Sequence, residues 1–71
     1  MASYDIAVWE LDDPRKADDP DLEPTKIWGE KHPFIPRKGE EIQMNHALYE
    51  VVKVTYDLSE DYITLLVVRT R

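Results

Sequence analysis

The sequence contains no cysteine, and only two glycines and two histidines among its 71 residues. Without cysteine, no disulfide can stabilise the fold and no thiolate can bind a metal. The longest uninterrupted apolar runs, such as residues 65–68, contain only four residues, which is far shorter than a membrane span. Charged residues follow the first few positions at once, so no secretory signal is visible. We therefore expect a cytoplasmic protein with no membrane contact.

The residue patterns of common enzymes are also missing. Neither Ser3 nor Ser59 lies in a G-x-S-x-G elbow, and no glycine-rich phosphate loop is present. His32 and His46 form neither the HxH nor the HxxxH spacing that is typical of zinc sites. We therefore expect a non-catalytic protein that holds no cofactor and no metal.

Charge is distributed unevenly along the chain. The 15 acidic and 9 basic residues give a net charge of -6. Residues 1–24 contain eight acids and two bases, whereas residues 25–71 contain seven of each, so the whole excess lies in the first third. Binding to DNA or to anionic membranes needs lysine and arginine to neutralise phosphate. The balance therefore argues against a nucleic-acid partner.

The acidic residues gather in the segment DDPRKADDPDLEP, residues 12–24. Its three prolines exclude a continuous helix or a central strand, and loops of this length are often functional. Aligned as an EF-hand calcium loop from Asp12 to Glu23, the segment places Pro14 and Lys16 at ligand positions and Ala17 at the required glycine. The segment is therefore predicted to be a solvated acidic loop.

Apolar alternation and turn residues predict a single all-β domain over residues 1–71. The predicted strands cover residues 4–11, 25–30, 41–44, 47–56 and 62–69. Residues 32–36 are expected to be extended but irregular, and turns are expected at 37–40, 45–46 and 57–61. The expected architecture is a small curled antiparallel sheet or barrel of about five strands, with the acidic loop between the first two.

The two C-terminal hairpins allow a register to be predicted. Pairing Met44 with Ala47, and Tyr56 with Tyr62, leaves both faces of the sheet largely apolar. Two arrangements explain this pattern. Either the sheet curls so that its strands cover one another, or one face is buried against a second copy or a partner.

A family resemblance covers about residues 34–69. The stretches IPRKGEEI at 35–42 and LYEVVKV at 48–54 resemble the pattern P-x-x-G-[DE]-x-[IV] followed by Y-x-V-x-x-V. This pattern occurs in short phage-type and bacterial β proteins and in small SH3-like barrels. The resemblance implies an SH3-like barrel that serves as a binding module, with a viral origin, and it transfers no catalytic residue. The acidic loop is not part of the pattern.

The leading functional hypothesis is a small acidic binding protein that acts by contact with another macromolecule. A phage-encoded inhibitor of a host protein is one form of this hypothesis. The acids would engage a basic protein surface and the flanking tryptophans would anchor the contact. The candidate residues are Asp12, Asp13, Asp18, Asp19, Asp21, Glu23, Trp9 and Trp28.

Two other functions remain open. The chain is alternatively an oligomeric protein that binds or sequesters a small ligand such as a nucleotide, through the basic residues Lys31, His32, Arg37 and Lys38. It is alternatively a structural component of a virion or another assembly.

Overall fold

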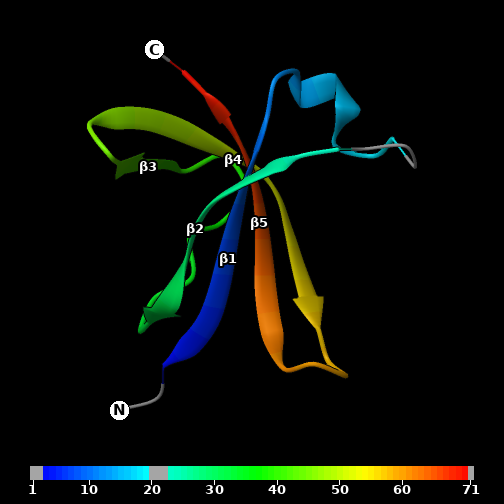
Figure 1. Ribbon diagram of the computed structural model, residues 1–71, viewed down its shortest axis with the longest axis vertical. Helices are drawn as coiled ribbons and strands as arrows, with labels where there is room; N and C mark the ends of the chain where they lie inside the picture. The colour runs from blue at the N-terminus through cyan, green and yellow to red at the C-terminus, as the bar shows by residue number, and fades with distance from the viewer. Residues whose placement is uncertain (1–2, 20–22, 71) are drawn as a thin grey trace.

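The computed structural model describes residues 3–19 and 23–70, which form one five-stranded sheet (Figure 1). The strands are β1 (Tyr4–Leu11), β2 (Thr25–His32), β3 (Glu41–Met44), β4 (Ala47–Asp57) and β5 (Tyr62–Arg69). One 3-10 turn, η1 (Pro14–Lys16), lies between β1 and β2. The predicted all-β fold is confirmed. Within the described residues, no helix has the length and apolar content needed to cross a membrane.

The strands follow the order β2-β1-β5-β4-β3 and curl into a half-barrel (Figure 1). Three of the four pairings are antiparallel, but β1 and β5 are parallel, which differs from the expected antiparallel sheet. Each successive strand reverses the direction of the chain, so the first and fifth strands run the same way. Their pairing is therefore parallel. The two ends of the sheet are the edges of β2 and β3.

The β3–β4 hairpin has the predicted register, with Met44 opposite Ala47. Asn45 and His46 both have positive φ angles, 51° and 66°. Two central residues with positive φ are characteristic of the type I′ turn, whose twist matches the flanking strands. The predicted two-residue turn is therefore confirmed.

The β4–β5 hairpin follows the predicted register only in part. Tyr49 lies opposite Arg69 as expected, but the register shifts between Val51 and Lys53. Val52 is an extra residue in β4, so Tyr56 lies opposite Ile63 and not opposite Tyr62. A bulge of this kind bends its strand and increases the local twist, which favours the curl of the sheet.

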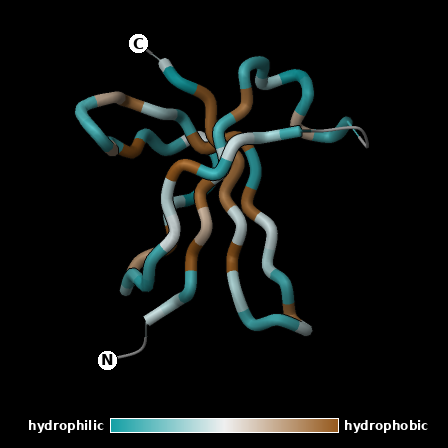
Figure 2. Tube along the Cα trace, viewed as in Figure 1, coloured by the Kyte–Doolittle hydropathy of each residue, from teal (hydrophilic) through white to brown (hydrophobic). Residues whose placement is uncertain are grey.

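The core lies on the inner face of the curled sheet. Figure 2 shows the most hydrophobic segments concentrated where the strands cross near the centre. The buried cluster consists of Ile6, Val8, Tyr49, Val51, Ile63, Leu65 and Val67. Leu11 and Leu66 are buried apart from this cluster, and the paired residues Trp9 and Leu66 belong to the outer face. Both faces of the sheet are thus partly apolar, as the sequence predicts.

Candidate binding surfaces

An apolar groove of about 320 Å³ opens on the inner face, between the edge strands β2 and β3. Val8 and Leu65 form part of its floor, Trp28 of β2 lines one wall, and Ile42 and Met44 of β3 line the other. Because each bordering strand is paired on one side only, the groove lies between two open strand edges. It can therefore accept both apolar side chains and backbone hydrogen bonds.

Three rings stand along the β2 side of this groove. The ring centroids of Trp28 and His32 are 6.4 Å apart and nearly perpendicular, and those of His32 and Phe34 are 5.9 Å apart. The backbone N–H of Phe34 donates to Nδ1 of His32 over 3.1 Å, and the same ring nitrogen lies 3.2 Å from the Phe34 carbonyl oxygen. This hydrogen bond fixes the bend after β2 and holds the Phe34 ring beside the groove.

Phe34 is 72% exposed, although it is large and apolar. It also lines an adjoining hollow together with Tyr4 and Tyr56, which are 42% and 59% exposed. Aromatic residues dominate the energetics of protein interfaces because they offer a large and rigid contact area. This end of the half-barrel therefore has the side chains of a binding surface.

The first half of the acidic loop is organised by its own bases. Asp13 accepts a hydrogen bond from the backbone N–H of Arg15 over 2.9 Å, and its Oδ2 lies 2.9 Å from Nη2 of Arg15. Hydrogen bonds from the Arg15 side chain and backbone lower the pKa of Asp13 from 3.8 to about 2. Lys16 forms a longer ion pair with Asp12, over 3.6 Å. Two of the predicted site residues are thus paired within the loop.

The second half of the loop contacts the outer face of the sheet. Nζ of Lys53 in β4 lies 3.0 Å from Oδ1 of Asp18. Asp18, Asp19 and Pro24 line a shallow hollow with Trp9 and Leu66. The described part of the loop therefore lies over the outer face of the sheet. The ion pairs that Asp12, Asp13 and Asp18 form with nearby bases reduce the negative electrostatic field expected of a solvated acidic loop. The side chains of Asp12 and Asp18 remain 82% and 90% exposed.

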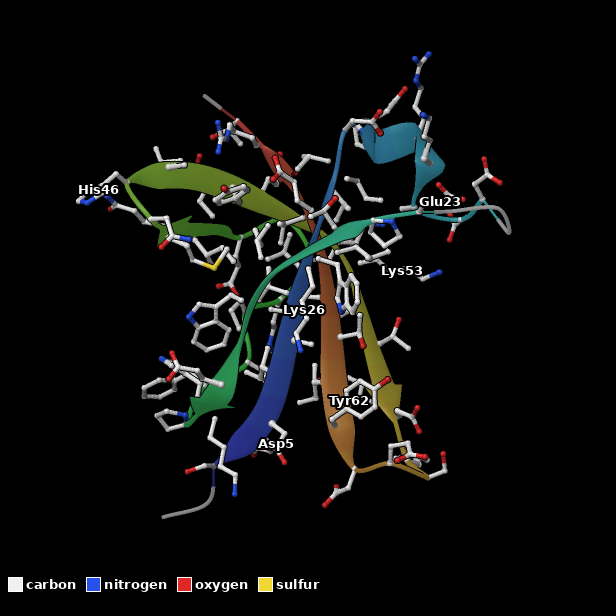
Figure 3. All side chains as sticks on the ribbon, viewed as in Figure 1. Asp5, Glu23, Lys26, His46, Lys53 and Tyr62 are labelled. Carbon is white, nitrogen blue, oxygen red and sulfur yellow. The ribbon has the colours of Figure 1, made fainter. Side chains whose placement is uncertain are left out.

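The remaining predicted partner residues lie apart. Figure 3 places Glu23 by the start of β2, on the side opposite His46 at the tip of the β3–β4 hairpin. Asp21 lies outside the described residues. Trp9 pairs with Lys26 on the outer face, whereas Trp28 pairs with Val8 on the inner face. The structure therefore does not bring the two tryptophans together on one surface.

The four basic residues of the alternative hypothesis are divided among three places. His32 lines the apolar groove, and Lys31 lies opposite Asp5 on the other face of β2. Arg37 and Lys38 line a separate hollow of about 510 Å³, which they share with Lys53 and Tyr56.

The turn that carries Arg37 and Lys38 is fixed against β4. The N–H of Arg37 donates to the Glu40 carboxylate over 2.6 Å. Gly39 has a φ of 92° and donates to the Val51 carbonyl over 2.8 Å, while the N–H of Val51 donates to the Glu40 carbonyl over 2.9 Å. These bonds place the turn beside the Val52 bulge and therefore close to Lys53.

Sequence reasoning missed three features of these surfaces. It did not single out Phe34, because an apolar residue between prolines gives no sign of its exposure. It did not identify the groove, because β2 and β3, although consecutive along the chain, lie at opposite ends of the strand order, which local patterns do not reveal. It also passed over Glu41 and Glu50, which lie directly opposite each other. The predicted Met44–Ala47 pairing already implies this last contact.

Within the part of the chain that the structure describes, no three histidine, aspartate or glutamate side chains converge as metal ligands. Comparison of the chain with protein-family models, with curated proteins and with solved structures returned no match.

Proposed function

We propose that this chain is a small, non-catalytic binding protein that acts by contact with a second protein whose docking surface is basic. The observation that carries the proposal is the apolar groove beside the exposed ring of Phe34. The net charge of -6 indicates that the docking surface of the partner is positively charged.

Two contributions to the binding free energy and the association rate support this proposal. An exposed aromatic ring beside a preformed apolar groove gains free energy when a partner covers both. A net negative charge accelerates encounter with a basic protein and disfavours acidic ones. Such a chain acts by occupying a surface of its partner, and inhibition of a host protein by a phage-encoded chain is one use of this kind.

The test compares two truncations of exposed apolar side chains. Phe34→Ala removes the groove-side ring, and Leu58→Ala removes a 92% exposed side chain in the β4–β5 turn. Proteins captured from a lysate are identified and purified, and their association with each variant is measured at low and at moderate salt. We expect Phe34→Ala alone to weaken binding, and salt to slow association with every form.

Two results would contradict this proposal. One is equal binding by the Phe34→Ala and Leu58→Ala variants, which would remove the groove from the contact. The other is association that does not change with salt, which would remove the electrostatic contribution.

A second candidate function is binding of a small phosphorylated ligand. The observation that favours it is the hollow where Arg37, Lys38 and Lys53 gather beside the exposed ring of Tyr56. An incoming phosphate would have to displace Asp18 from Lys53, and an exposed ion pair of this kind contributes only about 0–1 kcal/mol.

Inorganic pyrophosphate is a suitable probe for this hollow. We expect it to shift the amide resonances of residues 37–40 and of Lys53. Asp18→Asn should tighten binding, because it removes the internal competitor, and the Arg37→Ala/Lys38→Ala double variant should abolish it. Equal shifts in the double variant would reject the site.

A further inference from the structure

The outer edge of β3 presents backbone groups that no neighbouring strand of the sheet uses. The N–H of Thr70 donates to the Leu48 carbonyl over 2.9 Å, so the backbone groups of Leu48 are directed toward the β5 side of β4. In an antiparallel pair, the residue opposite such a position directs its own N–H and C=O away from the pair. Gln43 lies opposite Leu48, and Glu41 is two residues earlier on the same strand. Glu41 and Gln43 therefore present their backbone groups at the open edge.

The two faces of β3 differ in chemistry. Ile42 and Met44 pack against the inner core and line the apolar groove. Glu41 and Gln43 are exposed, and their side chains belong to the outer face because side chains alternate along a strand; Gln43 also borders the groove. A strand added at this edge would therefore meet an apolar row on one face and a polar row on the other.

The polar row contains an uncompensated pair of like charges. Glu41 and Glu50 lie directly opposite each other, and both are exposed. Among residues 3–19 and 23–70, neither carboxylate has a salt bridge or a side-chain hydrogen bond to another group. The next residue in this row is Val68 of β5, which is apolar. Like charges directly opposite each other destabilise a sheet, so a cation in this row would be favoured.

We propose that β3 accepts an extended segment of the partner as an antiparallel strand, with apolar residues opposite Ile42 and Met44 and a lysine or arginine opposite Glu41. This inference rests on the proposed function and specifies its site. Read from its N-terminus, the segment has the pattern apolar–any–apolar–basic. Its backbone bonds to Glu41 and Gln43, its apolar side chains enter the groove, and its cation extends the row of Glu50 and Glu41.

Charge distinguishes this edge from the other open edge and from self-association. The edge strand β2 carries Lys26 and Lys31 against one acid, Glu30, and this excess of positive charge disfavours a basic segment and protects the edge from pairing. A second copy at β3 would bring another Glu41 and Glu50 to the same edge, and the equal charges would oppose it. The occupant that fits β3 is therefore a basic segment of a different protein.

The probe is the blocked hexapeptide Thr-Val-Thr-Val-Lys-Thr, together with a control peptide in which the lysine is glutamate. Affinity is measured by amide chemical shifts of the full chain. We expect shifts at Glu41 and Gln43, and about two- to fivefold tighter binding of the lysine peptide, which is the range of a cross-strand charge pair. Glu41→Lys should reverse the preference, whereas Glu60→Lys, the same charge change in the β4–β5 turn, should not.

Three outcomes would overturn the inference. These are no binding of either peptide, shifts confined to β2, or a charge preference that Glu41→Lys and Glu60→Lys change equally. Denaturation of each variant verifies that it is folded. A natural partner that depends on Phe34 but leaves the β3 amides unshifted would refute strand addition while the proposed binding function stands. Binding of the natural partner that depends neither on Phe34 nor on salt would refute the proposed function itself.

Discussion

Glu41 and Glu50 face each other across β3 and β4, and no cation of the described chain is bonded to either carboxylate. This repulsion lowers the free energy of unfolding. The loss matters in a domain of this size, because a short chain buries a small fraction of its surface and is correspondingly marginal in stability. In the proposed complex, the same repulsion favours a basic partner. The two glutamates thus destabilise the free protein but favour the binding of a basic partner.

Removing one member of the pair should stabilise the free protein. We expect Glu41→Gln to raise the free energy of unfolding by about 0.2–1 kcal/mol in low salt, since it removes a like-charge cross-strand contact. Urea denaturation measures the change, and added salt should reduce it. Unchanged or lower stability at low salt would show that the two carboxylates do not repel each other in the folded protein.

Asp13 should make stability depend on pH in strong acid. The Arg15 hydrogen bonds lower its pKa from 3.8 to about 2, so its contribution is complete above pH 3.8 and disappears as the pH falls through about 2. Hydrogen bonds from the Ser59 side chain and the Glu60 backbone lower the pKa of Asp57 in the same direction.

The measurement compares Asp13→Ala with the wild-type chain across this range. We expect the variant to be less stable near neutral pH, and the difference to vanish below about pH 2. A constant difference at every pH would contradict the Asp13–Arg15 interaction.

The two glycines should respond differently to alanine. Gly39 has a φ of 92°, a region that residues with a side chain rarely adopt, so Gly39→Ala should cost about 1–2 kcal/mol. At Gly29 the only close contact of the added methyl group would be with the flexible end of Lys26, which can move, so Gly29→Ala should be nearly neutral. Denaturation of both variants checks the contrast, and equal costs would contradict the turn geometry at residues 37–40.

Two leucine truncations should separate the core from the surface. Leu65 is 1% exposed on the inner face, whereas Leu58 is 92% exposed in a turn. We expect Leu65→Ala to cost about 2–5 kcal/mol, enough to unfold much of a small domain, and Leu58→Ala to change stability by less than about 0.5 kcal/mol. Thermal unfolding provides the comparison. A stable Leu65→Ala variant would place the core elsewhere.

Local patterns in the sequence predict the strands well. β1, β3 and β5 have the predicted bounds, and β2 and β4 extend only slightly further, to His32 and Asp57. Alternation of apolar residues and the residues that form turns act over a few positions, so they are visible in the sequence. The positive φ angles of Asn45 and His46 are an example of turn chemistry that is fully local.

Features that depend on distant parts of the chain were not predicted. The Val52 bulge fits a turn that docks on β4 through Gly39, and no local pattern marks it. The contact of Asp18 with Lys53 joins residues 35 positions apart. The same limit applies to the prediction of the candidate site. Residues 12–24 were predicted as its centre, whereas the groove lies between β2 and β3, which are the two ends of the strand order. Counting chain reversals gives β1 and β5 the same direction, but their pairing depends on the strand order, which no local pattern shows.

Amide hydrogen exchange in the free protein tests the central claim, the open edge of β3, most directly. We expect an alternation, in which the amides of Ile42 and Met44, bonded to β4, exchange slowly while those of Glu41 and Gln43 exchange rapidly. Val51, which is fully buried and bonded to Glu40, should be protected. Protection of Glu41 and Gln43 at every protein concentration would show that the edge is already paired within the chain, and it would contradict both the open groove and the proposed strand addition.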